Sequence, residues 1–420
     1  MHKADSRRPG CLSSPSGPRR GIVSKVVALG SAAIILAACG SGPTAPSASG
    51  PIKIGVVTSL SGALASLGSF NKNGVDLAVQ QINGGGGLNG RKIEVSYEDD
   101  QSLPAQAVIA FNKFASEHVA AVLGPVSSDS ALAIKGGPFR SNNNIPWVAL
   151  AAADEIVEPV QPYAFMDAAR SSVVAQRLVD YFKSQGLTRM GVWYASDQAF
   201  ANTGYNATKQ LAQQAGITFV DDEPFSSSAT TDFSTLFAKL HSSGAQGLLV
   251  WVSGGPAVQI TKAAYNGGFH LPLFFSHAQA TPLYWGAKAT GQASEGAYVV
   301  TQLGPIVSYL SDSLALKKVG TDMIAAYKLA NGGQEPPKFA FDGYIGMELI
   351  ADAIKRKGAS GAEIRAGLES VNLLTPQGLY KMSPTDHSGV TLPYVQIVQI
   401  RNNQPVPPQY TLDQLKKLTN

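Results

Sequence analysis

From residue 52 to residue 401, short apolar runs alternate with longer segments in which apolar residues recur every three or four positions. A short apolar run bounded by turn residues is typical of a buried strand, and the three-to-four spacing is typical of a helix with one buried face. The pattern predicts strands at 52–58, 92–97, 120–123, 146–150, 190–194, 217–220, 247–252, 273–275, 297–300 and 393–401. It predicts helices at 73–82, 107–114, 173–182, 204–215, 233–241, 256–265, 321–329 and 341–357.

The order of these elements indicates the fold class. Strand and helix alternate through most of the chain, which is typical of α/β proteins with parallel sheets and helices on both faces. Two sets of elements are visible, one from Ile52 and a second from about Ser171. The sets share a pattern of elements without a sequence repeat, so we predict two similar α/β halves and not a solenoid.

The stretch AAVLGPVSSDSALAIKGGPF, at 120–139, combines a buried strand, a sharp turn and a helix that we expect to carry Phe139. Ser127, Ser128 and Asp129 are all good N-caps for that helix. The N-terminus of a helix presents unpaired N–H groups and partial positive charge, which predicts an anion site at the carboxyl edge of the sheet. Serine hydroxyls here can bind a ligand carboxylate, and the alternative is that they only cap the helix.

The first 38 residues have the features of an export signal. Arginines and lysines precede an apolar stretch at 22–38, and LAACG at 36–40 resembles the lipobox of bacterial lipoproteins. We therefore predict a signal peptide at 1–38 and lipidation of Cys39. A transmembrane anchor is the alternative, but the apolar run is short for one and is interrupted by Gly30 and Ser31. The arginine pair at 19–20 leaves a twin-arginine export route open.

Removal of the signal changes the charge balance. Six of the 33 lysines and arginines and one of the 29 acidic residues precede Cys39, which leaves 27 basic against 28 acidic residues. A nearly neutral mature chain gives no indication of nucleic-acid binding. Cys11 is removed with the signal, so no disulfide is possible. Residues 39–51, rich in serine, proline, alanine and glycine, predict a flexible tether to the membrane.

Several motifs are weighed and set aside. G-x-G-x-x-G at Gly85, Gly87 and Gly90 follows a predicted helix and precedes a strand, the reverse of a dinucleotide site, so we interpret it as a turn. The chain has no G-x-S-x-G and no H-E-x-x-H. His270 and His277 are the closest histidine pair, and we interpret them as core or solvated side chains. The acidic run 98–100 is interpreted as a strand end. We therefore expect no enzyme activity, catalytic residue, cofactor or metal.

The chain resembles the leucine/isoleucine/valine-binding protein family, the type I periplasmic solute-binding proteins of ABC importers. The resemblance rests on IKIGVVTSLSG at 52–62, NKNGVDLAVQQINGGGGLNGRKIEVSYEDD at 71–100, VLGPVSSDSA at 122–131 and DFSTLFAKLHSSGAQGLLV at 232–250. It implies two Rossmann-like lobes, joined by three crossovers, that close on a small-molecule solute. Lobe 1 would be 52–169 with 301–389, and lobe 2 would be 170–300 with 390–420. It also implies ABC permease and ATPase partners, and we expect a monomer.

The resemblance also implies positions for the ligand pocket. Ser128 matches the family serine that holds the ligand carboxylate. The family's threonine, lid tyrosine and ammonium-binding acid fall near Ala152, Leu67 and Ala278, so those groups are lost here. The implied pocket comprises Leu67, Val126, Ser127, Ser128, Leu150, Ala151, Ala152, Phe200, Ser253, His277, Ala278 and Gln279.

The carboxylate half of an amino-acid site is thus retained, and the ammonium half is not. A buried ammonium without a counter-charge is costly, so we expect a ligand that does not depend on an α-ammonium, such as an aliphatic or aromatic carboxylate. Asp197 and Glu295 could supply a substitute acid, although we interpret both as solvated surface residues. A ligand sensor without a transport role, or an exported enzyme, are the alternative functions.

Overall fold

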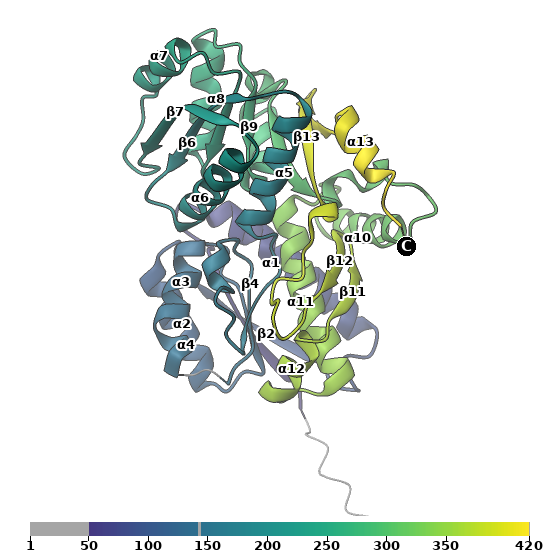
Figure 1. The fold of residues 1–420 in the computed structure, drawn as a ribbon. Helices are drawn as coiled ribbons and strands as arrows, with labels where there is room; N and C mark the ends of the chain where they lie inside the picture. Colours follow the sequence, from purple (N-terminus) through teal and green to yellow (C-terminus); the bar gives the residue numbers. More distant parts are fainter. Residues whose placement is uncertain (1–49, 142–143, 420) are drawn as a thin grey trace, which may run out of the picture. The chain divides into compact units, whose positions relative to one another are not determined.

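The computed structural model describes residues 50–141 and 144–419, in which strands and helices alternate along most of the chain (Figure 1). The predicted signal peptide, Cys39 and nearly all of the tether lie outside the described residues. Within the described part, no helix is long and apolar enough to cross a membrane.

The first half of the chain forms a five-stranded sheet in the order β2-β1-β3-β4-β5. All four pairings are parallel, as the α/β prediction requires. The strands β1, β3, β4 and β5 are largely buried, whereas β2 at the edge of the sheet is partly exposed. β5 was not predicted, because three apolar residues between polar turns give too short a signal. The strands are β1 (Ile52–Thr58), β2 (Ile93–Asp99), β3 (Ala121–Leu123), β4 (Trp147–Ala149) and β5 (Ala164–Met166).

A seven-stranded sheet in the order β14-β13-β10-β9-β8-β6-β7 contains the second set of strands (Figure 1). The pairings from β7 to β10 are parallel, but β13 pairs antiparallel with β10 and β14 antiparallel with β13. Parallel pairing was therefore the wrong expectation at this edge. The strands are β6 (Arg189–Ala195), β7 (Thr218–Phe225), β8 (Leu248–Trp251), β9 (Leu273–Phe275), β10 (Tyr298–Gln302), β13 (Val395–Arg401) and β14 (Gln404–Val406).

The helices agree with the predicted ones in place, although most are longer. The predicted helix through Phe139 is wrong in its end, because α3 stops at Gly136 and Pro138 begins a new short helix. A hairpin of β11 (Asn372–Thr375) and β12 (Gly378–Lys381) was also not predicted. The helices are α1 (Ala65–Gly84), α2 (Pro104–Ser116), α3 (Ser128–Gly136), α4 (Pro138–Ser141), α5 (Ser171–Ser184), α6 (Ala199–Gln214), α7 (Ser234–Ser242), α8 (Pro256–Asn266), α9 (Pro282–Trp285), α10 (Ala315–Ala330), α11 (Lys338–Lys357), α12 (Gly361–Leu368) and α13 (Gln409–Leu415).

Helices α1 and α11 pack closely because both carry glycine at the contact. A Cβ at Gly74 would lie 2.0 Å from the carbonyl oxygen of Ala340, and a Cβ at Gly343 would lie 2.0 Å from the carbonyl oxygen of Asn71. The side-chain amide of Asn71 also donates to the carbonyl oxygen of Phe339 at 2.8 Å. These contacts fix the N-terminus of α11 against α1, although most of the chain separates the two helices.

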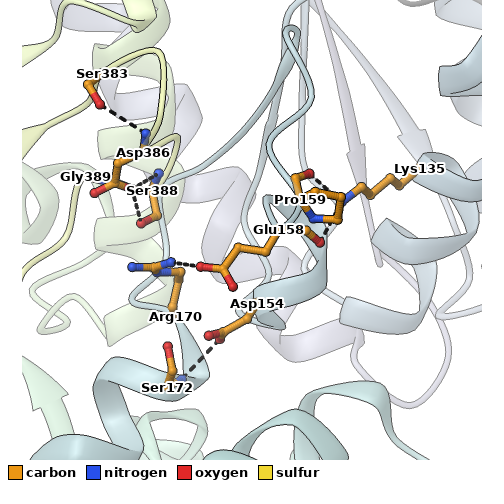
Figure 2. Close-up of polar contacts among 10 residues, drawn as sticks. All are labelled: Lys135, Asp154, Glu158, Pro159, Arg170, Ser172, Ser383, Asp386, Ser388 and Gly389. Carbon is orange, nitrogen blue, oxygen red and sulfur yellow. Dashed lines mark hydrogen bonds and ion pairs between the residues drawn. The ribbon is translucent and has the colours of Figure 1, made fainter.

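The chain passes from the first sheet to the second after β5, and polar contacts surround this passage (Figure 2). Asp154 Oδ1 accepts a hydrogen bond of 3.1 Å from a backbone N–H in the first turn of α5. Arg170, just before α5, pairs with Glu158. Asp386, on the segment that leads back to β13, accepts from the backbone N–H and the hydroxyl of Ser388 at 3.0 and 2.9 Å. Carboxylates thus accept hydrogen bonds in both segments that connect the two sheets, the one after β5 and the one before β13.

Two interpretations of motifs are confirmed by the backbone. β2 ends at Asp99, so the acidic run is a strand end. Asp99 Oδ1 accepts from the backbone N–H groups of Leu60 and Ser61, which closes the turn after β1. The glycine-rich segment is a turn between α1 and β2, with Gly87 and Gly90 at φ values of 83° and 80°.

Candidate functional site

A cavity of about 330 Å³ opens where the carboxyl ends of strands from both sheets meet. Its lining residues follow β1, β2, β3 and β4 in the first sheet and β6, β8 and β9 in the second. The start of α11 completes the wall. Loops at the carboxyl ends of parallel strands are where α/β proteins usually bind ligands, and this volume suits a small organic molecule.

The turn after β3 sets the N-terminus of α3 at the cavity. Gly124 has a φ of 89°, and a Cβ there would lie 1.9 Å from the carbonyl oxygen of Val57, so the turn requires glycine. Ser127 is the N-cap, and its Oγ accepts from the backbone N–H of Ser130 at 3.4 Å. Ser127 is therefore the serine that caps the helix, and the Ser128 hydroxyl is not used for capping.

Ser128 is buried in the first turn of α3 and lines the cavity. Its Oγ accepts hydrogen bonds from the backbone N–H groups of Ala152 at 3.4 Å and Ala153 at 3.2 Å. Those bonds fix the rotamer and leave the hydroxyl proton as the group that can be donated. With the positive end of the α3 dipole beside it, this corner of the cavity can bind an anionic oxygen.

An apolar wall lies on the first-sheet side of the cavity. Leu67, Val126 and Phe339 form a small cluster of their own, separate from the main core, and the partly buried Leu64 packs against them. The sequence analysis missed Phe339 because it predicted the start of α11 too late, at residue 341. The aliphatic or aromatic body of a ligand would pack on this wall.

The opposite wall comes from the second sheet. The rings of Phe200 and His277 meet edge to face with centroids 5.6 Å apart, and Phe200 also packs on the buried Trp251. Ser253 is held by Gln198, whose Oε1 accepts from the Ser253 backbone N–H at 2.8 Å. Trp251 belongs to the core, as the sequence analysis favoured.

Two carboxylates line the cavity, but their surroundings differ. Asp197 accepts hydrogen bonds from Ser226, Ser227 and Ser228, and these, against the effect of burial, lower the pKa of Asp197 to about 2. Asp129 uses Oδ1 to accept from the backbone N–H of Ala199 at 3.0 Å. Burial raises the pKa of Asp129, and the bond from Ala199 opposes this rise.

Glu295, the other proposed substitute acid, does not line this cavity. Its Oε2 accepts from the backbone N–H of Asn402 at 2.8 Å, and its Oε1 lies 3.4 Å from Arg401 Nη1. Asp129 is therefore the carboxylate with an oxygen that can face a ligand. The sequence analysis considered it only as a helix cap.

Lys338 is a second residue that the sequence analysis missed. It is the first residue of α11, its side chain is 3% exposed, and it lines the cavity. Its Nζ lies 2.6 Å from Asp342 Oδ2, one helical turn away. A lysine four residues before an aspartate at the start of an apolar helix was the available signal. It is also a common pattern on exposed helices, which is why it did not stand out.

The structure brings together all but one of the predicted pocket residues. Gln279 does not line the cavity, because its side chain is buried and its amide donates to the carbonyl oxygen of Val252 at 3.0 Å. The described residues hold no cluster of His, Cys, Asp or Glu suited to a metal ion. The predicted residues that line the cavity are Leu67, Val126, Ser127, Ser128, Leu150, Ala151, Ala152, Phe200, Ser253, His277 and Ala278.

Comparisons with known proteins agree with the fold. A Leu/Ile/Val-binding protein homolog of Brucella melitensis is 24% identical over 312 residues, which cover 74% of this chain and 80% of the relative. An extracellular ligand-binding receptor of Rhodopseudomonas palustris has the same fold, with a TM-score of 0.77 and 24% identity over 86% of this chain and 100% of its own. An R. palustris solute-binding protein in complex with benzoate has a TM-score of 0.73 and 22% identity over 85% and 95%.

A family model described as periplasmic binding protein matches residues 51–405. The matched region contains both sheets, apart from Val406 at the end of β14, and every residue that lines the cavity. Membership of this family implies an extracytoplasmic location. With its α/β fold of two lobes and a cavity at the strand ends, the chain belongs to the periplasmic binding protein family.

Proposed function

We propose that this protein is the solute-binding component of an ABC importer and captures a small organic carboxylate in the cavity at the strand ends. The observation that carries the proposal is the N-terminus of α3, where Ser128 has its hydroxyl fixed by two backbone N–H groups beside an apolar wall. This arrangement offers a donor and positive dipole for a carboxylate and a surface for its hydrocarbon part. The protein binds its ligand without chemical conversion.

The ligand does not depend on an α-ammonium. Ala278 stands where the resemblance places the ammonium-binding acid, and Asp197 is occupied by three serines. A neutral methyl group in that position favours a carboxylate without an amino group. The relative named for Leu/Ile/Val binding and the structural neighbour with benzoate indicate that this family accommodates both ligand types.

An amino acid is the second candidate, and Asp129 is the observation that favours it. Its carboxylate lies at the cavity with one oxygen used by Ala199. An ammonium reaching Asp129 would have the counter-charge that Ala278 cannot provide. This placement differs from the family pattern, so Asp129→Asn separates the two candidates: it weakens amino-acid binding and leaves carboxylate binding in place.

Ligand capture proceeds by closure of two lobes, 52–169 with 301–389 and 170–300 with 390–420. Contacts between the two sets of elements support closure, since Asp129 accepts from Ala199 and Thr203 Oγ1 donates to Glu155 Oε2 at 2.6 Å. The mature protein begins at Cys39, which anchors it to the outer face of the membrane through its lipid and the 39–51 tether. It acts as a monomer that delivers its solute to the permease and ATPase subunits.

A thermal-shift screen of the purified mature protein tests the ligand class. The panel contains aliphatic and aromatic carboxylates, their amides and the common amino acids. Binding to the native state raises the melting temperature by mass action, so the carboxylates should give the largest shifts. A panel in which only amino acids raise the melting temperature would support the second candidate.

A further inference from the structure

Two further polar side chains line the cavity, on elements other than the α3 turn. Lys338 begins α11, and His277 lies in the short 3-10 helix η2 (His277–Gln279) after β9. Both side chains line the cavity, and both are almost fully buried. The carboxylate site at Ser128 uses neither of them.

The surroundings of Lys338 leave donors for a ligand. An ammonium group has three N–H donors, and the ion pair with Asp342 uses one of them. The other oxygen of Asp342 accepts from the side-chain amide of Gln377 at 3.0 Å. Nζ also lies 5.1 Å from the centroid of the Phe339 ring, which belongs to the apolar wall. Lys338 is therefore held in place at the cavity, and a ligand oxygen can accept a further hydrogen bond from it.

A second acid, Asp167, lies close to Lys338. Asp167 is fully buried nearby, and neither of its carboxyl oxygens has a hydrogen-bond partner among residues 50–141 and 144–419. Burial first and the charge of Asp342 second raise the pKa of Asp167 well above its ordinary value, which favours the uncharged form of this carboxyl. Asp342 is the ion-pair partner of Lys338, and a ligand carboxylate would accept from the N–H donors of Lys338 that Asp342 does not use.

His277 adds a neutral donor or acceptor close to Lys338. Its Nδ1 has no hydrogen-bond partner in the described part of the chain. Burial, and then the charge of Lys338, hold the pKa of His277 well below its usual value. A neutral imidazole beside an ammonium suits a carboxylate oxygen, which accepts from both groups without a second cation.

We propose that Lys338 and His277 bind a second carboxylate, so that the ligand is a small dicarboxylate with its hydrocarbon body on the wall of Leu67, Val126 and Phe339. This inference rests on the proposed function, because it assumes that the first carboxylate is held at Ser128. It adds a ligand class and a residue, Lys338, that the family pattern does not supply.

The test compares matched mono- and dicarboxylates by titration calorimetry. Hexanoate and adipate form an aliphatic pair, and benzoate and terephthalate form a rigid aromatic pair. At least one dicarboxylate should bind the wild-type protein ten times more tightly than its monocarboxylate, or better. In the double variant Lys338→Met with Asp342→Asn, this preference should fall below threefold, while monocarboxylate affinity changes by less than about threefold. The double variant removes both charges of the pair, so neither partner is left as a buried charge without the other.

Two further variants complete the test. His277→Phe keeps the Lys338–Asp342 ion pair and should also reduce the dicarboxylate preference by at least threefold, so it carries the comparison if the double variant does not fold. Lys135→Met is the matched control. Lys135 is a buried lysine on α3 that does not line the cavity and donates to the carbonyl oxygens of Glu158 and Pro159 at 3.2 and 3.4 Å. This variant should keep the preference.

The outcomes separate the inference from the proposed function. One outcome would overturn the second site and leave the first in place: the monocarboxylates bind, Ser128→Ala weakens their affinity, and the dicarboxylates bind no more tightly than the monocarboxylates. Retention of the dicarboxylate preference in the folded double variant would also overturn the inference. If none of the four probes binds the folded wild type, the proposed function fails together with the inference.

Discussion

At the scale of single residues, the proposed ligand class depends on which side chains at the cavity have donors or charges that a ligand can use. Ser128 was predictable, because a serine at a helix N-terminus after a buried strand has a mechanism attached to it. Lys338 was not predictable, because the hydrophobic pattern that locates a helix assigns its buried positions to apolar residues and not to a lysine. Its burial depends on the pair with Asp342, and the cavity around it exists only once α11 meets η2.

The first prediction concerns Ser128. Ser128→Ala removes a hydrogen bond to the ligand carboxylate, and a bond to a charged group contributes about 1.5 to 3 kcal/mol. Carboxylate binding measured by calorimetry should weaken by roughly one to two decades. Ser171→Ala is the matched control, since the buried Ser171 donates to the carbonyl oxygen of Ala152 from outside the cavity. Equal affinity in wild type and Ser128→Ala would move the carboxylate away from α3.

At the scale of elements, most strands and helices were predictable from the sequence. The short elements and the direction of β13 were not. Long periodic segments such as α5 and α8 gave strong signals. Short elements such as β5, and the β11–β12 hairpin, contain too few residues for periodicity to distinguish them from loops. The antiparallel pairing of β13 with β10 could not be predicted from the sequence either, because the direction of a strand depends on where the chain returns to the sheet.

Helix α11 supplies the second prediction, at Glu348. Burial first and the charge of Asp352 second raise the pKa of Glu348 to about 7 from an ordinary value of 4.5. The native state therefore holds a proton that the unfolded chain releases, and this stabilisation is complete below pH 4.5 and is lost as the pH rises through about 7. Glu348→Gln should raise the free energy of unfolding at pH 8 by on the order of 2 kcal/mol.

Chemical denaturation at pH 5 and pH 8 measures this effect. The gain from Glu348→Gln should shrink at pH 5, where the wild-type carboxyl is mostly protonated. Glu94→Gln, at an exposed position on β2, is the control and should show no such dependence. A gain from Glu348→Gln that is the same at both pH values would show that Glu348 does not titrate in this way.

At the scale of the whole molecule, the third prediction is that ligand binding closes the two lobes. The resemblance implies three segments of chain between the proposed lobes, and the contacts Asp129–Ala199 and Thr203–Glu155 join residues that the proposed division assigns to different lobes. Small-angle scattering of the mature protein should show a smaller radius of gyration when a carboxylate found in the screen is added to saturation. An unchanged radius at saturation would count against hinge closure.

Membrane attachment is the fourth prediction, and it concerns Cys39, which lies outside the described residues. Cys39→Ala removes the thiol that would carry the lipid. The variant should leave the membrane fraction when cells are fractionated, while the wild type stays with it. A variant that is processed normally and remains with the membrane would contradict the lipoprotein prediction.

The most direct test of the central claim is titration calorimetry of the wild-type protein with three ligands: the tightest-binding carboxylate from the screen, leucine and valine. The cavity is lined by Ser128, the proposed carboxylate donor, and by Ala278, where the family resemblance places an ammonium-binding acid. The carboxylate should therefore bind at least tenfold more tightly than either amino acid. Submicromolar binding of leucine or valine would contradict it.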